Sequence, residues 1–70
     1  MRTGTFRYNK AIDRWYFENE LLDYHCGEVV EFKIGNRYVA GRLEYDREWY
    51  VIFPDARFRL MPGRTYQVRI

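Results

Sequence analysis

Apolar and polar residues alternate at every second position through most of this chain. Residues 5–8 alternate, residues 9–13 have the composition of a turn, and residues 15–17 resume the alternation. This pattern predicts a first β-hairpin. The alternation returns in residues 57–60 and again in residues 65–70. No stretch has the spacing of an amphipathic helix, so the pattern predicts an all-β protein.

Residues 28–45 predict a second hairpin, whose register follows from its turn. Gly35-Asn36 is a two-residue connection in which the glycine supplies the positive φ that such turns need. A slip of one residue would turn Glu31 and Lys33 into the core, so the register is strongly specified. Counting outward pairs Ile34 with Arg37, Phe32 with Val39 and Val30 with Gly41 on the core face, and Lys33 with Tyr38, Glu31 with Ala40 and Val29 with Arg42 on the outer face.

Residues 49–53 raise a question, because they carry apolar side chains on both sides of one strand. A three-residue loop over residues 46–48 pairs Trp49 with Tyr45 and turns Trp49 into the core. A two-residue loop turns Trp49 outward and Tyr50 inward. We favour the longer loop because it buries more apolar surface. In both cases a second apolar row remains on the outer face.

The chain is too short for two full sheets, so the pattern predicts one domain over residues 1–70. We expect a strongly curled small barrel of about five to seven short antiparallel strands. Residues 19–27 are irregular and acidic, and we expect a loop with room for one helical turn. Its apolar residues Leu21, Leu22 and Tyr24 would pack against the core. The predicted core is Phe6, Trp15, Phe17, Val30, Phe32, Ile34, Val39, Leu43, Trp49, Val51, Phe58, Tyr66 and Val68.

Aromatic side chains compensate for the small size of the domain. A chain of 70 residues buries only about 60% of its unfolded surface on folding and is marginally stable. Phe, Tyr and Trp make up 20% of the residues, and each buries a large area. Cys26 is the only cysteine and His25 the only histidine, which excludes an intramolecular disulfide and the usual structural zinc sites. We predict no metal and no cofactor.

No arrangement of residues in the sequence points to catalysis. The chain has no serine and no glycine-rich phosphate loop. His25 and Cys26 are of the types that form base and nucleophile pairs, but neighbouring residues of an extended chain point to opposite sides. We therefore predict that the protein is not an enzyme.

The charged residues are unevenly distributed. The net charge is only +2, and ten of the twelve basic residues are arginine, whose planar group suits recognition. Residues 13–31 hold six acids, whereas residues 57–70 hold four arginines and no acid. The lone thiol and the lack of a secretory signal or a long apolar run predict a cytoplasmic protein that does not enter a membrane.

Three runs of residues point to a family: FRYNKAIDRWYF, HCGEVVEFKIGNRYVAGRLEYDREWYVIF and GRTYQVRI. They resemble a family of short uncharacterised proteins from Firmicutes, a domain of unknown function that is often carried on mobile elements. The resemblance implies an SH3-like small barrel and a cytoplasmic setting, and it implies no activity. The matching positions are Gly27, Gly35, Arg42, Glu44, Trp49 and Tyr50, with Tyr38 where tryptophan is commoner.

Three functions are compatible with these patterns. In the first, a protein or peptide binds tyrosine and arginine on the outer face, since these residues dominate interface hot spots. In the second, a single-stranded nucleic acid stacks on the same aromatics and contacts the C-terminal arginines through its phosphates. In the third, the outer apolar row packs against a second copy or under residues 19–27, and the protein is structural, a monomer or a weak homodimer.

We favour binding of a protein or peptide, because a net charge of +2 is small for a protein that binds nucleic acid. We expect Arg42 to be held by neighbouring carboxylates and framed by Tyr38 and Tyr50. The candidate binding residues are Tyr38, Arg42, Glu44, Tyr50, Arg57 and Arg59.

Overall fold

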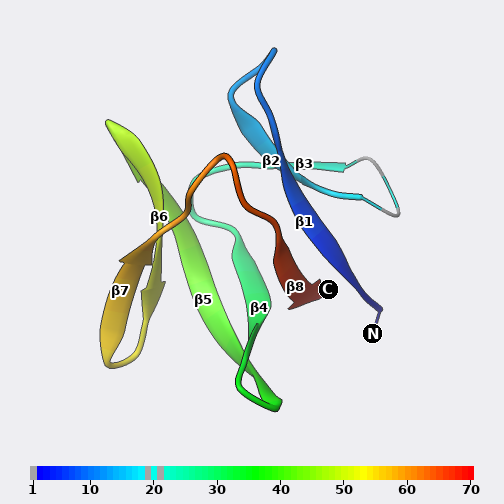
Figure 1. The fold of residues 1–70 in the computed structure, drawn as a ribbon. Helices are drawn as coiled ribbons and strands as arrows, with labels where there is room; N and C mark the ends of the chain where they lie inside the picture. Colours follow the sequence, from blue (N-terminus) through cyan, green and yellow to red (C-terminus); the bar gives the residue numbers. More distant parts are fainter. Residues whose placement is uncertain (1, 19, 21) are drawn as a thin grey trace.

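A computed structural model describes residues 2–18, 20 and 22–70, which form one antiparallel sheet of eight strands (Figure 1). The all-β prediction is confirmed, and the strands number eight in the described residues, where we expected five to seven. They are β1 (Thr3–Asn9), β2 (Arg14–Phe17), β3 (Leu22–Tyr24), β4 (Val29–Ile34), β5 (Arg37–Asp46), β6 (Glu48–Phe53), β7 (Ala56–Arg59) and β8 (Tyr66–Arg69).

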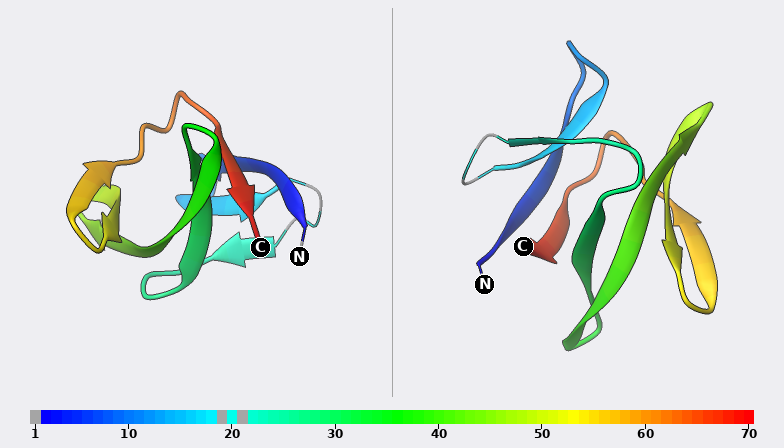
Figure 2. Two further views of the ribbon diagram at one scale, coloured as in Figure 1. Left: turned by 90° about the horizontal axis from the view of Figure 1, so that it is seen from below. Right: turned by 180° about the vertical axis from the view of Figure 1, so that it is seen from behind.

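The strand order in the sheet is β3-β2-β1-β8-β4-β5-β6-β7. The C-terminal strand β8 lies between β1 and β4, so it joins the N-terminal strands to the meander from β4 to β7. The sheet is strongly curled (Figure 2), but β3 and β7 each have one neighbour among the described strands, so it does not close. The chain ends meet, because the backbone N–H of Arg2 donates to the Ile70 carbonyl at 3.0 Å.

The β4–β5 hairpin has the predicted register. All six predicted pairs occur, from Ile34 opposite Arg37 to Val29 opposite Arg42. Gly35 has a φ of 66°, a backbone conformation that glycine adopts without strain. The turn chemistry and the alternation of residues therefore agree on one pairing.

Trp49 faces the core, which answers the question that residues 49–53 raised. It is opposite Tyr45, as the longer loop requires, and only 4% of its surface is exposed. Tyr50 is half-buried on the opposite face. The turn is tighter than we expected, since the residues on either side of Arg47 still pair, and Arg47 reverses the chain with a φ of 67°.

The core fills the inner face of the curled sheet. Phe32 lies near its centre and is 2% exposed. Tyr24 is part of the core, as we expected of this residue of the acidic segment, whereas Leu60 was not predicted. The buried apolar residues are Phe6, Trp15, Phe17, Tyr24, Val30, Phe32, Leu43, Trp49, Val51, Leu60 and Val68.

Four predicted core residues are more exposed than we expected. Ile34 and Phe58 are 48% and 39% exposed, and Val39 and Tyr66 are half-buried. Ile34, Phe58 and Tyr66 line a groove at the gap in the sheet, and Val39 lies close to the end of the β4–β5 hairpin. Their positions follow from the open sheet, because a closed barrel would have covered this side.

The segment that we expected to be a loop contains the strand β3. This strand pairs with β2 and places Tyr24 opposite Trp15, where its ring meets that of Phe6 at 5.4 Å. We expected Leu22 to pack on the core, but it is 54% exposed. Leu21, which we also expected to pack there, lies outside the described residues, as does residue 19. In the strand order β3 is at the opposite end from β6 and β7.

Candidate functional site

Five of the six candidate residues adjoin one another on the outer face, the side of β4 to β7 that turns away from the core. Glu44 is opposite Tyr50, and Tyr50 is opposite Arg59, so these three side chains form a row across β5, β6 and β7. In the next row, Arg42 and Arg57 lie on either side of an isoleucine of β6. Positions that are far apart in the sequence are therefore brought together by the register.

The guanidinium groups in these rows are held by their neighbours. The Arg57 guanidinium carbon lies 5.2 Å from the centre of the Tyr50 ring. Nε of Arg42 donates to a carboxylate oxygen of Glu44 at 2.7 Å. Arg59 forms an ion pair of 3.1 Å with a glutamate at the start of β6. We call the following five residues the arginine–tyrosine cluster: Arg42, Glu44, Tyr50, Arg57 and Arg59.

Tyr38, the sixth candidate, lies apart from this cluster. It is four residues before Arg42 on β5, about 13 Å along an extended strand. The guanidinium carbon of Arg69 lies 4.7 Å from the centre of its ring, and Arg69 forms an ion pair of 2.6 Å with Glu31. Arg42 is thus held by one carboxylate, that of Glu44, where we expected more than one, because Glu31 pairs with Arg69. The two tyrosines stack with Arg69 and Arg57 and do not frame Arg42.

An apolar hollow beside the cluster was missed by the sequence reasoning. Its volume is about 330 Å³, and Val29, Ala40, Ile52 and Pro54 line it together with Arg42. Val29 is 63% exposed at the edge of the hollow. Ala40 has the smallest side chain of these five residues, so it leaves space between its larger neighbours. The signal in the sequence was the second apolar row of residues 49–53, together with an alanine on the neighbouring strand β5.

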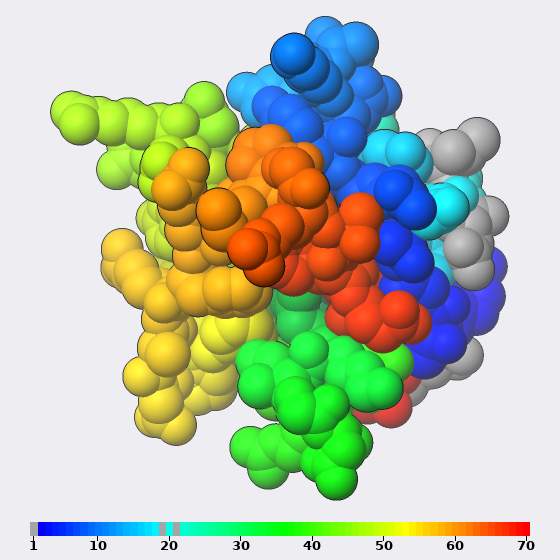
Figure 3. Space-filling view, in the orientation of Figure 1, coloured from blue at the N-terminus to red at the C-terminus, as the bar shows by residue number. Residues whose placement is uncertain are grey.

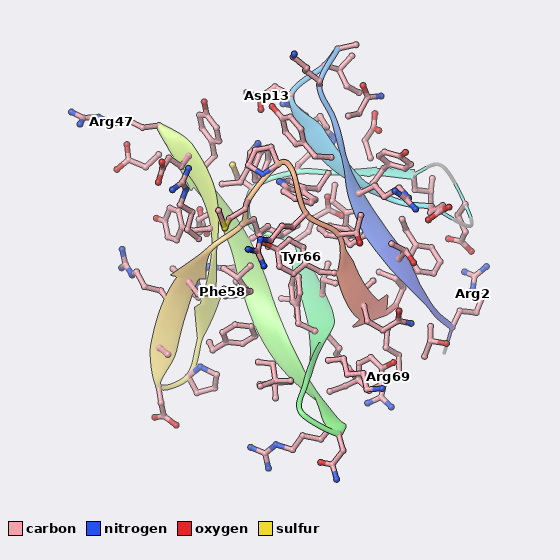
Figure 4. All side chains as sticks on the ribbon, in the orientation of Figure 1. Arg2, Asp13, Arg47, Phe58, Tyr66 and Arg69 are labelled. Atoms are coloured by element: carbon pink, nitrogen blue, oxygen red, sulfur yellow. The ribbon has the colours of Figure 1, made fainter. Side chains whose placement is uncertain are left out.

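A carboxylate that the sequence did not single out joins two hairpins. Asp13 lies at the tip of the β1–β2 hairpin with a φ of 53°, and Figure 4 labels it. Its carboxylate accepts a hydrogen bond from the Tyr8 hydroxyl and another, of 3.1 Å, from Nε1 of Trp49. The bond from Tyr8, followed by that from Trp49, lowers the pKa of Asp13 below its ordinary value of 3.8. The same bond to Asp13 raises the pKa of Tyr8.

We expect this carboxylate to make stability depend on pH in the acid range. A carboxyl group whose pKa is lower in the folded state stabilises fully above its unfolded pKa of about 3.9, and its contribution is lost as the pH falls through the folded value. Asp13→Asn cannot ionise but tolerates a positive φ. Between about pH 5 and pH 2, the urea midpoint of the parent should therefore fall more steeply than that of the variant. Parallel pH profiles of the two proteins would contradict this assignment.

His25 and Cys26 lie at a second cavity of about 280 Å³ beside Asp13 and Trp49. Both residues are exposed. The hydrogen bonds of His25 within the described part of the chain involve its backbone groups.

In residues 2–18, 20 and 22–70, no group of three or more His, Cys, Asp and Glu side chains is arranged to hold a metal ion. The same residues include no helix that is long and apolar enough to cross a membrane.

The fold and the outer face define a small all-β domain that carries a structured arginine and aromatic surface. The chain belongs to the family described as "Domain of unknown function (DUF5348)", whose model matches residues 4–70. The resemblance to a family of unknown function is thereby confirmed. No curated protein and no solved structure matches the chain.

Proposed function

We propose that this protein is a non-catalytic interaction module that binds a protein or a peptide on its outer face. The observation that carries the proposal is the apolar hollow lined by Val29, Ile52 and Arg42, which adjoins the arginine–tyrosine cluster. An apolar centre with arginine and tyrosine around it is the composition of interface hot spots. A partner side chain in the hollow would bury Val29 and Ile52, while a partner carboxylate or carbonyl would accept from the guanidinium.

Preorganisation of the arginines supports this proposal. The bond from Arg42 to Glu44 uses Nε, and the guanidinium carries further donors on its two terminal nitrogens. The ring of Tyr50 likewise orients Arg57. Because side chains that are already ordered lose less conformational entropy on binding, such a surface binds more tightly than a mobile one of the same composition.

Binding of a single-stranded nucleic acid is the second candidate function, since Tyr50 offers a ring for stacking beside Arg57 and Arg59. Ion pairs weigh against it. Arg59 is paired with Glu48, and Arg69 with Glu31, so two of the four C-terminal arginines are already partly neutralised. Contact with phosphates would have to compete with these carboxylates. Self-association through the outer face is the third candidate.

Arg42→Lys separates these functions. Lysine keeps the charge but loses the planar group and its paired donors. If a protein binds the hollow, the variant should fold normally and bind about 30-fold more weakly, a loss of about 2 kcal/mol, with little change in salt dependence. The partner would be identified by cross-linking in cells that express this protein, followed by mass spectrometry. Its affinity for each variant would be measured by calorimetry. The matched control is Arg64→Lys, because Arg64 lies outside the outer face, in the segment between β7 and β8.

A nucleic acid would give a different result in the same set of variants. Arg42→Lys would then bind a single-stranded oligonucleotide almost as the parent does. Replacing Arg57 and Arg59 by glutamine would lower the slope of log affinity against log salt by about one unit for each lost phosphate contact. Equal affinities of all variants for the cross-linked partner would show that this partner does not bind the outer face.

Three further features belong to this proposal. We propose that the curled sheet is a variant of the SH3-like small barrel, supported by the strong curl of its eight antiparallel strands (Figure 2). We also propose that the protein acts in the cytoplasm of Firmicutes, as an accessory protein of a mobile element, on the family resemblance alone. A non-catalytic role is supported by His25, whose hydrogen bonds within the described residues involve only its backbone, so that no group there orients its ring.

A further inference from the structure

A second surface lies where the sheet fails to close. We call it the seam groove, and its volume is about 370 Å³. The rings of Phe58 on β7 and Tyr66 on β8 meet across it with centres 5.9 Å apart, and Figure 4 labels both. Figure 3 shows the molecule hollowed between β7 and the β4–β5 hairpin. The groove is lined by Lys33, Ile34, Phe53, Ala56, Phe58 and Tyr66.

β7 borders the seam groove with an unpaired edge. This strand is last in the sheet order, so β6 is its one neighbour among the described strands. The backbone N–H of Leu60 donates to a carbonyl of β6 at 2.9 Å. In an antiparallel ladder alternate residues point to the partner strand, so Phe58 and Ala56 also point to β6. The backbone groups of Arg57 and Arg59 then point to the open side, and all four residues of β7 are exposed.

We propose that the seam groove binds an extended acidic segment of another protein, which adds to β7 as a further strand. An added strand would take up the outward N–H and C=O groups of β7, the way in which sheet edges recognise peptides. Its side chains alternate between the two faces. Apolar ones would lie in the groove beside Phe58 and Ile34. Carboxylates would lie on the other side, beside Arg57, which has no ion-pair partner in the described residues, whereas Arg59 is already paired with Glu48.

Charge selects an acidic occupant over a second copy of this chain. β7 carries two arginines and no acid, and Lys33 is the charged residue at the groove. Within the described residues Arg57 stacks on Tyr50 and has no ion-pair partner. Pairing of β7 with β7 of a second copy would set arginines beside arginines, which is unfavourable. A segment in which acidic and apolar residues alternate would place its apolar side chains in the groove and its carboxylates beside the arginine side chains of β7.

The test uses the full chain and a synthetic peptide. The probe is a short peptide, capped at both ends, in which glutamate alternates with valine and phenylalanine. Titrated into the ¹⁵N-labelled protein, it should shift the amide signals of residues 56–59 and 33–34 in a saturable way. Methylation of alternate peptide nitrogens, or replacement of glutamate by lysine, should weaken binding at least about tenfold, since each removes one class of contact. Absence of saturable binding overturns the proposal, and so does binding of the methylated peptide or the lysine peptide as tightly as the parent peptide.

Two variants of β4 assign the binding to one surface. Ile34→Glu puts a negative charge at the seam groove, and Val29→Glu puts the same charge on the outer face of the same strand. Both positions are about half exposed or more, at 48% and 63%, so both variants should fold. Ile34→Glu should weaken binding of the glutamate peptide at least about tenfold, and Val29→Glu should leave its affinity unchanged.

The opposite pattern would place the peptide on the outer face and overturn strand addition, without affecting the proposed function of that face. Concentration-dependent dimers that Ile34→Glu abolishes would show that a second copy occupies the groove, which also overturns the proposal. Loss of outer-face binding in Arg42→Lys, with the glutamate peptide still bound, would show that addition to β7 does not depend on the hollow at Arg42, as strand addition requires.

Discussion

Phe32→Ala should leave the protein largely unfolded at room temperature. Phe32 is 2% exposed, and its ring meets those of Phe6, Phe53, Phe58 and Tyr66 with centres 5.8 to 6.3 Å apart. Truncation of a buried phenylalanine to alanine costs about 3 to 5 kcal/mol. A domain this small has a total stability of similar size. Urea unfolding followed by tryptophan fluorescence measures the loss.

The matched control for this variant is Ile34→Ala, on the same strand and the same face. Since Ile34 is already 48% exposed, less apolar surface is lost, and the destabilisation should be less than about half that of Phe32→Ala. A cooperative transition of Phe32→Ala close to that of the parent would show that the ring cluster does not hold the fold together. Equal losses in the two variants would contradict the difference in burial.

Gly41→Val should destabilise the protein by about 3 kcal/mol, although valine is the better residue for a strand. Gly41 is buried in the middle of β5, opposite Val30. A Cβ atom at this position would collide with Cγ1 of Val51 and come within 2.7 Å of Cε1 of Phe53. Val51 is fully buried, so relieving the collision requires Val51 and Phe53 to shift within the core or β5 and β6 to separate. The loss is measured by urea unfolding.

Ala40→Val is the control, because Ala40 is the neighbouring residue on β5 and points to the outer face, where it is exposed. Its effect on stability should lie within about 0.5 kcal/mol. The added methyl groups would, however, occupy the apolar hollow, so this variant should lose binding to an outer-face partner while it stays folded. A similar destabilisation of both variants would mean that crowding between β5 and β6 is not the cause.

The strand pairings were readable from the residues alone wherever a turn and the alternation agreed. The Gly35-Asn36 turn specifies one pairing, and a shift by one residue would have buried Glu31 and Lys33. The side that Trp49 faces followed in the same way from the larger apolar area buried. The strand β3 could not be foreseen, because three residues in an acidic segment carry too little alternation, and pairing with β2 decides their structure.

The residues of the outer face were predictable, but their contacts were not. Alternation places Arg42, Tyr50 and Arg57 on that face, since side chains of one strand alternate with a period of two. Which carboxylate or ring holds each guanidinium depends on the stagger and twist of neighbouring strands, and long side chains reach several positions. Thus Arg57, and not Arg42, stacks on Tyr50.

The bond from Asp13 to Trp49 and the seam groove depend on how the whole sheet curls. Asp13 and Trp49 are 36 residues apart in the chain and come together because the β1–β2 turn lies beside the beginning of β6. Phe58 and Ile34 have the alternation of core residues, yet they are exposed because β7 ends the sheet without reaching a partner strand. Local patterns act between neighbours along a strand or across a turn, and they set pairing and facing. Curvature and closure arise from the packing of all the strands together, so no single segment carries that information.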